Sequence, residues 1–121
     1  MAFIVVVDDD ADVRELIETT LQLAGHEVRT VTSGPEALAA VGEARPDLVI
    51  TDHVMPGMTG LELAQALRAD AGTADVPIIL LTGTEKYRDL FAVDRWIEKP
   101  FSPAQLRSHV QLLLRRSAST R

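Results

Sequence analysis

The sequence predicts an α/β fold: a doubly wound five-stranded parallel sheet, (βα)5, with a shortened or missing fourth helix. Short β-rich runs alternate with segments of helical periodicity along the whole chain, which is typical of this class. The first and third strand runs, residues 3–7 and 47–51, are almost wholly apolar, as expected for parallel strands buried on both faces. The length of 121 residues fits one domain, which we expect over residues 1–116.

The first part of the chain predicts a strand, a helix and a second strand. Residues 3–7 are Phe-Ile-Val-Val-Val, a β-branched apolar run typical of a central strand. Apolar residues recur at helical spacing over residues 13–24, and Gly25 directly after them is a common helix stop. Residues 27–31 then form a short second strand.

Two capping boxes mark the next two helices. In such a box a Ser or Thr side chain accepts from the N–H three residues later, where a Glu or Gln returns the bond. Ser33 and Glu36 predict the first box, and Thr59 and Glu62 predict the second. The almost wholly apolar run at residues 47–51 lies between these helices and predicts the third strand.

The last third of the chain predicts two strands and a final helix. Residues 77–82 and 95–98 form the fourth and fifth strands. Ser102 and Gln105 predict a third capping box, and Pro103 between them suits the first helical position.

The connection over residues 83–94 is short. It supplies 12 positions, which is the minimum for a parallel crossover of about 10–12 residues including its helix. We therefore expect its helix to be short or absent. We also expect residues 117–121 to form a disordered tail.

Composition excludes several classes of function. The chain has 12 Lys and Arg against 18 Asp and Glu, a net charge of −6, which argues against nucleic-acid binding through this domain. The absence of Cys excludes disulfides, thiolate zinc sites and thiol catalysis. No apolar run approaches the roughly 20 residues that span a bilayer, and no basic region precedes the first apolar stretch. We therefore expect no membrane contact and a cytoplasmic location.

Polar side chains stand at the carboxyl ends of four predicted strands. They are Asp8 and Asp9 after the first strand, Asp52 after the third, Thr82 at the end of the fourth and Lys99 after the fifth. Ligands of parallel α/β sheets bind at this edge. We therefore expect these side chains to converge on one site.

The three carboxylates of this set predict a bound cation. They are ionised at neutral pH, with unperturbed pKa values of about 4, and they repel one another unless a cation joins them. Oxygen ligands without His or Cys favour Mg²⁺ over zinc or copper. Because Mg²⁺ typically takes one or two carboxylates and a phosphate oxygen, a third carboxylate is left as a nucleophile. Lys99 and Thr82 could then hold a transferred phosphoryl group.

Each of these features has a purely structural explanation when taken alone. Aspartates before a helix are commonly caps, and we expect that role for Asp10 and Asp12. The alternate aspartates from Asp8 onwards also have EF-hand spacing. However, Val13 stands where that loop needs Gly and Thr19 where it needs Glu, which excludes a calcium loop. Only the joint occurrence at four strand ends favours a functional site.

Five short motifs are spread along nearly the whole chain. They are Val-Val-Val-Asp-Asp-Asp at 5–10, Pro-Asp-Leu-Val-Ile-Thr-Asp at 46–52, Met-Pro-Gly-Met-Thr-Gly at 55–60, Ile-Leu-Leu-Thr at 79–82 and Lys-Pro-Phe at 99–101. In these motifs and their order the chain resembles the receiver domains of two-component response regulators. The resemblance implies a flavodoxin/receiver-like fold. It also implies a switch that catalyses only its own phosphorylation and dephosphorylation, and not an enzyme with an outside substrate.

The resemblance implies a role for each acidic residue of the site. Asp52 would be the phosphoacceptor. Asp8 and Asp9 would bind Mg²⁺ together with Asp52, and the backbone carbonyl of Val54 would complete the protein's ligands.

The resemblance also implies roles for residues at the ends of the last two strands. Thr82 would hydrogen-bond the phosphoryl group, and Lys99 would pair with it. Trp96, three residues before Lys99, takes the position of the family's switch aromatic, with a fixed core anchor as the alternative. The bond between Lys99 and Pro100 is similar to one that is cis in the family.

Two positions depart from the family's pattern. His53 follows the phosphoacceptor where receivers usually carry an apolar residue. We interpret it as a surface residue, with titration beside the site as the alternative. The short segment 83–94 lacks the usual Gly-Ala-Asp-Asp-like turn and resembles receivers of hybrid sensor kinases. Because little rigid helix is expected there, we do not expect dimerisation through that face.

The resemblance implies a histidine kinase or histidine phosphotransferase as phosphodonor and an unknown downstream protein as partner. The chain could be a stand-alone regulator or a piece of a hybrid sensor kinase or larger regulator. One alternative is a phosphohydrolase of the haloacid-dehalogenase type, but Asp12 stands where that motif needs Thr or Val. A binding module that has lost phosphorylation is the other alternative, and the complete set of site residues argues against it.

Overall fold

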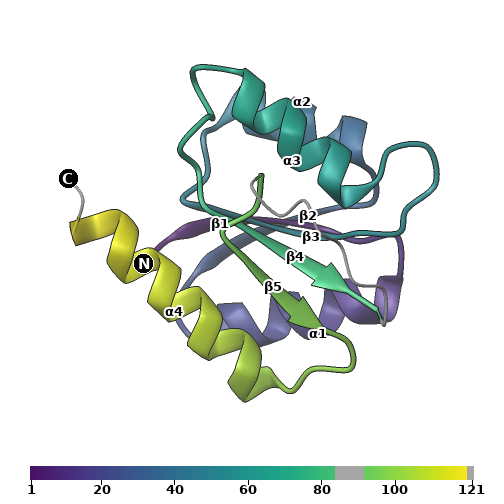
Figure 1. Cartoon of the computed structure of the whole chain (residues 1–121). Coiled ribbons are helices and arrows are strands. Elements are labelled where there is room, and N and C mark those ends of the chain that lie inside the picture. The colour runs from purple at the N-terminus through teal and green to yellow at the C-terminus, as the bar shows by residue number, and fades with distance from the viewer. Residues whose placement is uncertain (84–91, 120–121) are drawn as a thin grey trace.

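The computed structural model describes residues 1–83 and 92–119, and its centre is one five-stranded parallel sheet (Figure 1). The strands lie side by side in the order β2-β1-β3-β4-β5. Their bounds are β1 Phe3–Val7, β2 Glu27–Val31, β3 Leu48–Asp52, β4 Ile78–Thr82 and β5 Arg95–Glu98. The predicted doubly wound parallel sheet is confirmed.

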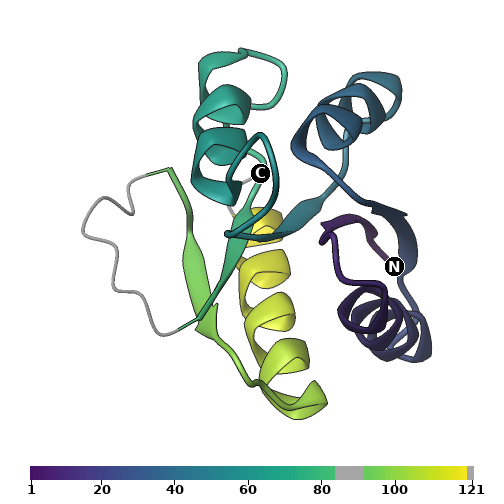
Figure 2. The ribbon, with the colours of Figure 1, turned by 90° about the vertical axis from the view of Figure 1, so that its right-hand side faces the viewer.

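Helices cover both faces of the sheet (Figures 1 and 2). In the described part of the chain they are α1 Ala11–Leu23, α2 Gly34–Glu43, α3 Gly60–Ala69 and α4 Pro103–Ser119. Helices α1 and α4 pack on one face, where Leu21 and Leu106 belong to one buried apolar cluster. Helices α2 and α3 pack on the other face, where Val41 and Leu67 belong to a second cluster. Burial of both sheet faces explains why the three central strands β1, β3 and β4 are almost wholly apolar, whereas the edge strands β2 and β5 carry exposed charged residues.

Two of the three predicted capping boxes form as expected. At the start of α3 the Thr59 side chain accepts from the Glu62 N–H at 3.1 Å, and the Glu62 carboxylate accepts from the Thr59 N–H at 3.0 Å. At the start of α4 Ser102 and Gln105 exchange the same pair of bonds at 3.1 and 2.8 Å. These bonds satisfy amide groups that a helix N-terminus leaves without partners.

The other two helix starts differ from the expectation in detail. At α2 the Ser33 side chain accepts from the Glu36 N–H at 3.3 Å, but the Glu36 carboxylate accepts from the hydroxyls of Thr32 and Ser33 and not from the Ser33 N–H. The neighbouring threonine hydroxyl competes for the carboxylate, so only half of the box forms. At α1 Asp10 is the N-cap, whereas Asp12 lies in the first turn and is not a cap.

The connection between β4 and β5 was predicted to contain a short or absent helix. Residues 84–91 lie outside the described residues. The prediction about this helix and the expected lack of dimerisation through that face both concern this segment and stay predictions. The entry to β5 is fixed by Arg68 of α3, which donates to the Asp94 carboxylate at 2.7 Å and to the carbonyls of Ala74 and Val76 at 3.0 and 2.6 Å. Asp94 also accepts from the Ile78 N–H at 2.8 Å, which ties β5 to the start of β4.

Helix α4 extends through Ser119 and so includes residues 117–119. The disordered tail expected over residues 117–121 stays a prediction. No Gly or Pro follows residue 116, so the sequence contains no signal that would end the helix earlier. Within the described ranges, no helix combines the length and the apolar character that a membrane span requires.

Candidate functional site

The predicted site residues lie where the sheet changes direction. The chain passes from β1 to β2 on one side and returns to β3 on the other side of β1, so the connections after β1 and β3 diverge. Such a switch point at the carboxyl edge is the usual ligand site of a doubly wound sheet. Asp8 directly follows β1, and Asp52 is the last residue of β3, one position earlier relative to the strand end than predicted. Because β3 pairs with β4 up to the position of Leu81, the strand includes Asp52.

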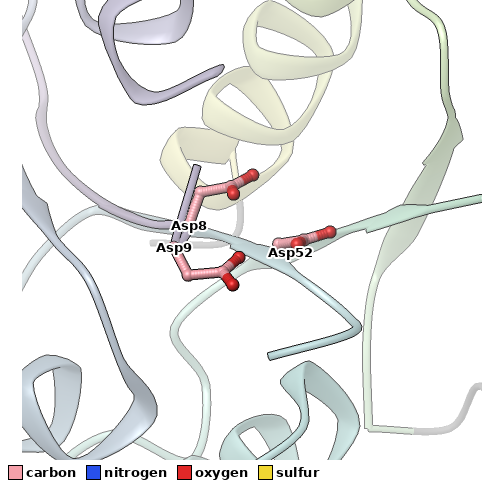
Figure 3. A group of neighbouring side chains, drawn as sticks. All are labelled: Asp8, Asp9 and Asp52. Carbon is pink, nitrogen blue, oxygen red and sulfur yellow. The ribbon is translucent and has the colours of Figure 1, made fainter. Parts of the chain in front are cut away.

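Three carboxylates converge at this point (Figure 3). Asp8, Asp9 and Asp52 each offer an oxygen, and these oxygens all lie within 4.8 Å of one another. Asp8 is fully buried and Asp52 is 8% exposed, whereas Asp9 is exposed to solvent. The cluster therefore has a buried floor and one open side from which a ligand could enter.

Lys99 supplies the positive charge of the cluster. Its Nζ lies 2.9 Å from Asp52 Oδ1 and 3.5 Å from Asp8 Oδ2. Its backbone N–H donates to the Thr82 carbonyl at 2.7 Å, which holds it at the edge of the sheet. Burial alone lowers the pKa of Lys99, but the hydrogen bond to Asp52 and the charges of Asp8 and Asp52 outweigh burial and raise that pKa. Lys99 is therefore charged at neutral pH.

Asp8 fits a cation ligand. Its Oδ1 accepts from the Asp10 N–H at 2.9 Å, while its buried Oδ2 accepts no hydrogen bond from the described residues. Burial raises the pKa of Asp8, and the charge of Asp52 raises it further, against the opposing effects of the Asp10 N–H and Lys99. Lys99 thus pairs with two buried carboxylates, while the third carboxylate of the cluster, that of Asp9, is exposed. An all-oxygen donor set with excess negative charge, in which one buried oxygen has only the ion pair with Lys99 and no hydrogen bond among the described residues, suits a hard divalent cation such as Mg²⁺.

The remaining predicted residues lie around this cluster. Thr82 ends β4, is 4% exposed, and stands one position beyond Leu81, the strand partner of Asp52. Val54 lies in the loop after β3 and is 63% exposed. The role of its backbone carbonyl as a metal ligand stays a prediction. The peptide bond between Lys99 and Pro100 is cis, as predicted.

Trp96 lies on β5 and is 54% exposed. It stands opposite Leu80 in the parallel register with β4. The alternative that Trp96 is a fixed core anchor is wrong, because more than half of its surface is accessible to solvent. Its role as a switch stays a prediction.

The interpretation of His53 as a surface residue is wrong. His53 is 7% exposed. Its N–H continues the sheet ladder by donating to the Leu81 carbonyl at 3.0 Å, and its carbonyl accepts from the Gly60 N–H at 2.8 Å. These bonds enclose the residue between β4 and the start of α3.

Sequence reasoning missed two residues beside the cluster. Arg14 of α1 donates from Nη1 to the Asp8 carbonyl at 2.7 Å. Gly60, the first residue of α3, leaves no room for a side chain, because a Cβ there would lie 2.2 Å from the Asp52 carbonyl oxygen. A glycine inside a capping box is a signal of close backbone approach, and it could have been noticed.

The chain is similar to known proteins in both sequence and structure. A family model for the response regulator receiver domain matches residues 4–111. The phosphate regulon transcriptional regulatory protein PhoB of Pseudomonas aeruginosa is 40% identical over 119 residues, which cover 94% of this chain and 52% of PhoB. The DNA-binding response regulator MtrA of Mycobacterium tuberculosis is also 40% identical over 119 residues, which cover 94% of this chain and 51% of MtrA. The chain thus spans about half the length of these curated relatives.

Two solved structures of the response regulator TrrA from Thermotoga maritima are similar along almost their full length, at 40% identity. One is TrrA in complex with Mg²⁺–BeF, with a TM-score of 0.85 and coverage of 93% of this chain and 99% of TrrA. The other is the histidine kinase ThkA in complex with TrrA, with a TM-score of 0.84 and coverage of 94% of this chain and 99% of TrrA. The sequence matches, the similar structures and the acidic cluster therefore all point to the same family.

Proposed function

The chain belongs to the family of response regulator receiver domains, and on that premise we propose that Asp52 accepts a phosphoryl group in a Mg²⁺-dependent reaction. The donor is a phosphohistidine on a histidine kinase or histidine phosphotransferase. One observation carries the proposal: the Lys99 ammonium bonds Asp52 inside a cluster of three carboxylates at the switch point of the sheet.

The residues divide the chemistry between them. Asp52 Oδ1 accepts from Lys99 Nζ at 2.9 Å and from the His53 N–H at 3.0 Å, which leaves Oδ2 as the attacking oxygen. An O–P bond forms to Asp52 while the N–P bond of the phosphohistidine breaks, and the electron pair of that bond returns to the imidazole. The Lys99 ammonium forms an ion pair with the oxygens of the transferred phosphoryl group, and the Thr82 hydroxyl donates a hydrogen bond to them.

Mg²⁺, held by Asp8, Asp9, Asp52 and the Val54 carbonyl, would supply the positive charge that offsets these carboxylates and the oxygens of the transferring group. The chain's own contribution is to keep the acidic residues close together at the sheet edge. Asp8 is held there by its N–H bond to the Val31 carbonyl at 3.2 Å and by the Asp10 N–H.

The test of this function is phosphorylation of the protein by a small phosphodonor. Incubation with phosphoramidate and Mg²⁺ should add the mass of one phosphoryl group to the intact protein, and EDTA should prevent the addition. A protein that keeps its unmodified mass with several phosphodonors and a cognate histidine kinase would instead be a binding module without phosphorylation.

Asp9→Asn should weaken Mg²⁺ binding by about 10–100-fold, since even the loss of an outer-shell partner of a metal site has that cost. Asp9 is exposed, so the fold should be unaffected. Calorimetric titration with Mg²⁺ measures the change. Asp12→Asn removes the same charge from an exposed position outside the cluster and is the matched control. Equal affinities for the two variants would exclude Asp9 from the site.

Trp96 should report the switch. A phosphoryl group adds about two negative charges and three acceptor oxygens beside Thr82 and Lys99. Movement of these residues passes along β5, which carries the half-exposed Trp96 three residues before Lys99. The emission spectrum of this single tryptophan should therefore change with Mg²⁺ and beryllofluoride, but not with Mg²⁺ and fluoride alone. A spectrum indifferent to the mimic would remove Trp96 from the switch.

The output of the domain passes to a downstream protein or to a further domain. PhoB and MtrA are regulators about twice as long as the match, so this chain could act alone or as part of a larger regulator or hybrid kinase. We propose signalling to a downstream protein, with no nucleic acid bound through this domain because its net charge is −6. We also propose that activation does not drive dimerisation through the face around residues 83–94.

A further inference from the structure

Arg14 reaches back from helix α1 to the loop that carries two of the three carboxylates. It is the fourth residue of α1, and side chains in helices lean toward the N-terminus of the helix. Its Nη1 donates to the Asp8 carbonyl at 2.7 Å, which is a short, charge-assisted hydrogen bond. The Arg14 N–H also donates to the Asp10 carbonyl at 3.0 Å, which fixes the base of the side chain.

The partner of Arg14 is unexpected for its surroundings. Five of the residues near it in sequence are acidic: Asp9, Asp10, Asp12, Glu15 and Glu18. Nevertheless, the ion pairs found among the described residues do not include Arg14. Its guanidinium bonds a neutral carbonyl, so its effect falls on the backbone and not on a carboxylate.

The carbonyl that Arg14 holds belongs to the peptide unit between Asp8 and Asp9. The Asp8 carboxylate is already held by the Asp10 N–H and lies 3.5 Å from Lys99. In contrast, no side-chain hydrogen bond or ion pair among the described residues holds the Asp9 carboxylate. The backbone sets the direction in which the Asp9 side chain leaves the chain, along its Cα–Cβ bond, and Arg14 restrains that backbone.

We propose that Arg14 is a positioning residue of the metal site, which directs the Asp9 carboxylate toward Asp8 and Asp52 by fixing the peptide before it. This inference rests on the proposed Mg²⁺-dependent function. The two possible effects of Arg14 on the affinity for Mg²⁺, positioning of Asp9 and simple charge repulsion, have opposite signs. A cation near a Mg²⁺ site repels the metal, so removal of its charge alone should tighten binding. Loss of positioning should weaken binding.

The test compares Arg14→Met with Arg115→Met. Both variants lose one guanidinium and keep an unbranched side chain, but Arg115 is exposed on α4 and makes none of these contacts. In calorimetric titration of the full chain with Mg²⁺, Arg14→Met should bind about tenfold more weakly than wild type. Arg115→Met should stay within about twofold of wild type. Arg14→Lys keeps a charged donor and should recover most of the affinity.

A second readout needs no metal. In the Mg²⁺-free protein, the ¹⁵N order parameter of the Asp9 amide should fall below the roughly 0.85 of rigid backbone in Arg14→Met only. Unchanged or tighter Mg²⁺ binding by Arg14→Met, with wild-type binding intact, would overturn the positioning role and leave the proposed function standing. The same holds for a rigid Asp9 amide in that variant. If wild type itself fails to bind Mg²⁺, both the inference and the proposed function are wrong.

Discussion

Asp52→Asn should abolish phosphoryl incorporation completely. The amide oxygen and nitrogen of asparagine carry no negative charge, so the side chain cannot attack phosphorus at a useful rate. The fold should persist, because the substitution removes one of three mutually repelling carboxylates and keeps an acceptor for the 2.9 Å bond from Lys99. Intact-mass measurement after incubation with phosphoramidate and Mg²⁺ reads the result directly.

Asp75→Asn is the matched control for this experiment. The Asp75 side chain is 85% exposed, and its contact with Arg45 is a surface ion pair at 3.7 Å. The Asp75→Asn protein should therefore be phosphorylated like wild type. Full phosphorylation of Asp52→Asn would mean that another carboxylate of the cluster is the acceptor.

Gly60→Ala should destabilise the protein by about 3 kcal/mol or more, which is the upper range for overpacking a filled space. The new Cβ would lie 2.2 Å from the Asp52 carbonyl oxygen and 2.7 Å from Leu80 Cδ1. Backbone cannot yield as a flexible side chain does, so either the start of α3 or the end of β3 has to move. For a domain of this size the melting temperature should fall by about 10 °C. Phosphorylation should slow as well, because the displaced backbone carries the acceptor.

Gly42→Ala separates this clash from the general effect of replacing a glycine. A Cβ at Gly42 of α2 would meet nothing within 4 Å. Because alanine favours the helix over glycine, that variant should be more stable than wild type, by up to about 1 kcal/mol. A Gly60→Ala protein as stable as Gly42→Ala would contradict the close packing of α3 against Asp52.

The sheet and its site could be predicted because both depend on local sequence patterns. The three central strands are buried on both faces and therefore appear as nearly continuous apolar runs, and parallel strands bring their carboxyl ends to one edge. Asp8, Asp9, Asp52 and Lys99 follow from that rule, and the structure brings all four together.

The errors arise from hydrogen bonds that the motifs do not encode, some of them tertiary and some local. The interpretation of His53 as a surface residue fails because its N–H donates to the Leu81 carbonyl of β4 and its carbonyl accepts from the Gly60 N–H of α3, which bury the residue. The Ser33 box forms by half because Thr32 competes for the Glu36 carboxylate. Arg14 was missed because its partner is a backbone carbonyl, and no residue type marks such a partner in a sequence.

The most direct measurement of the central claim is chemical mapping of the phosphorylated residue. Borohydride reduces an aspartyl phosphate to homoserine, which tandem mass spectrometry locates in the digested protein. The account predicts homoserine at position 52 alone, formed only when Mg²⁺ was present during phosphorylation. Homoserine at position 8 or 9, or a phosphoryl group that survives reduction on His53 or Thr82, would contradict it.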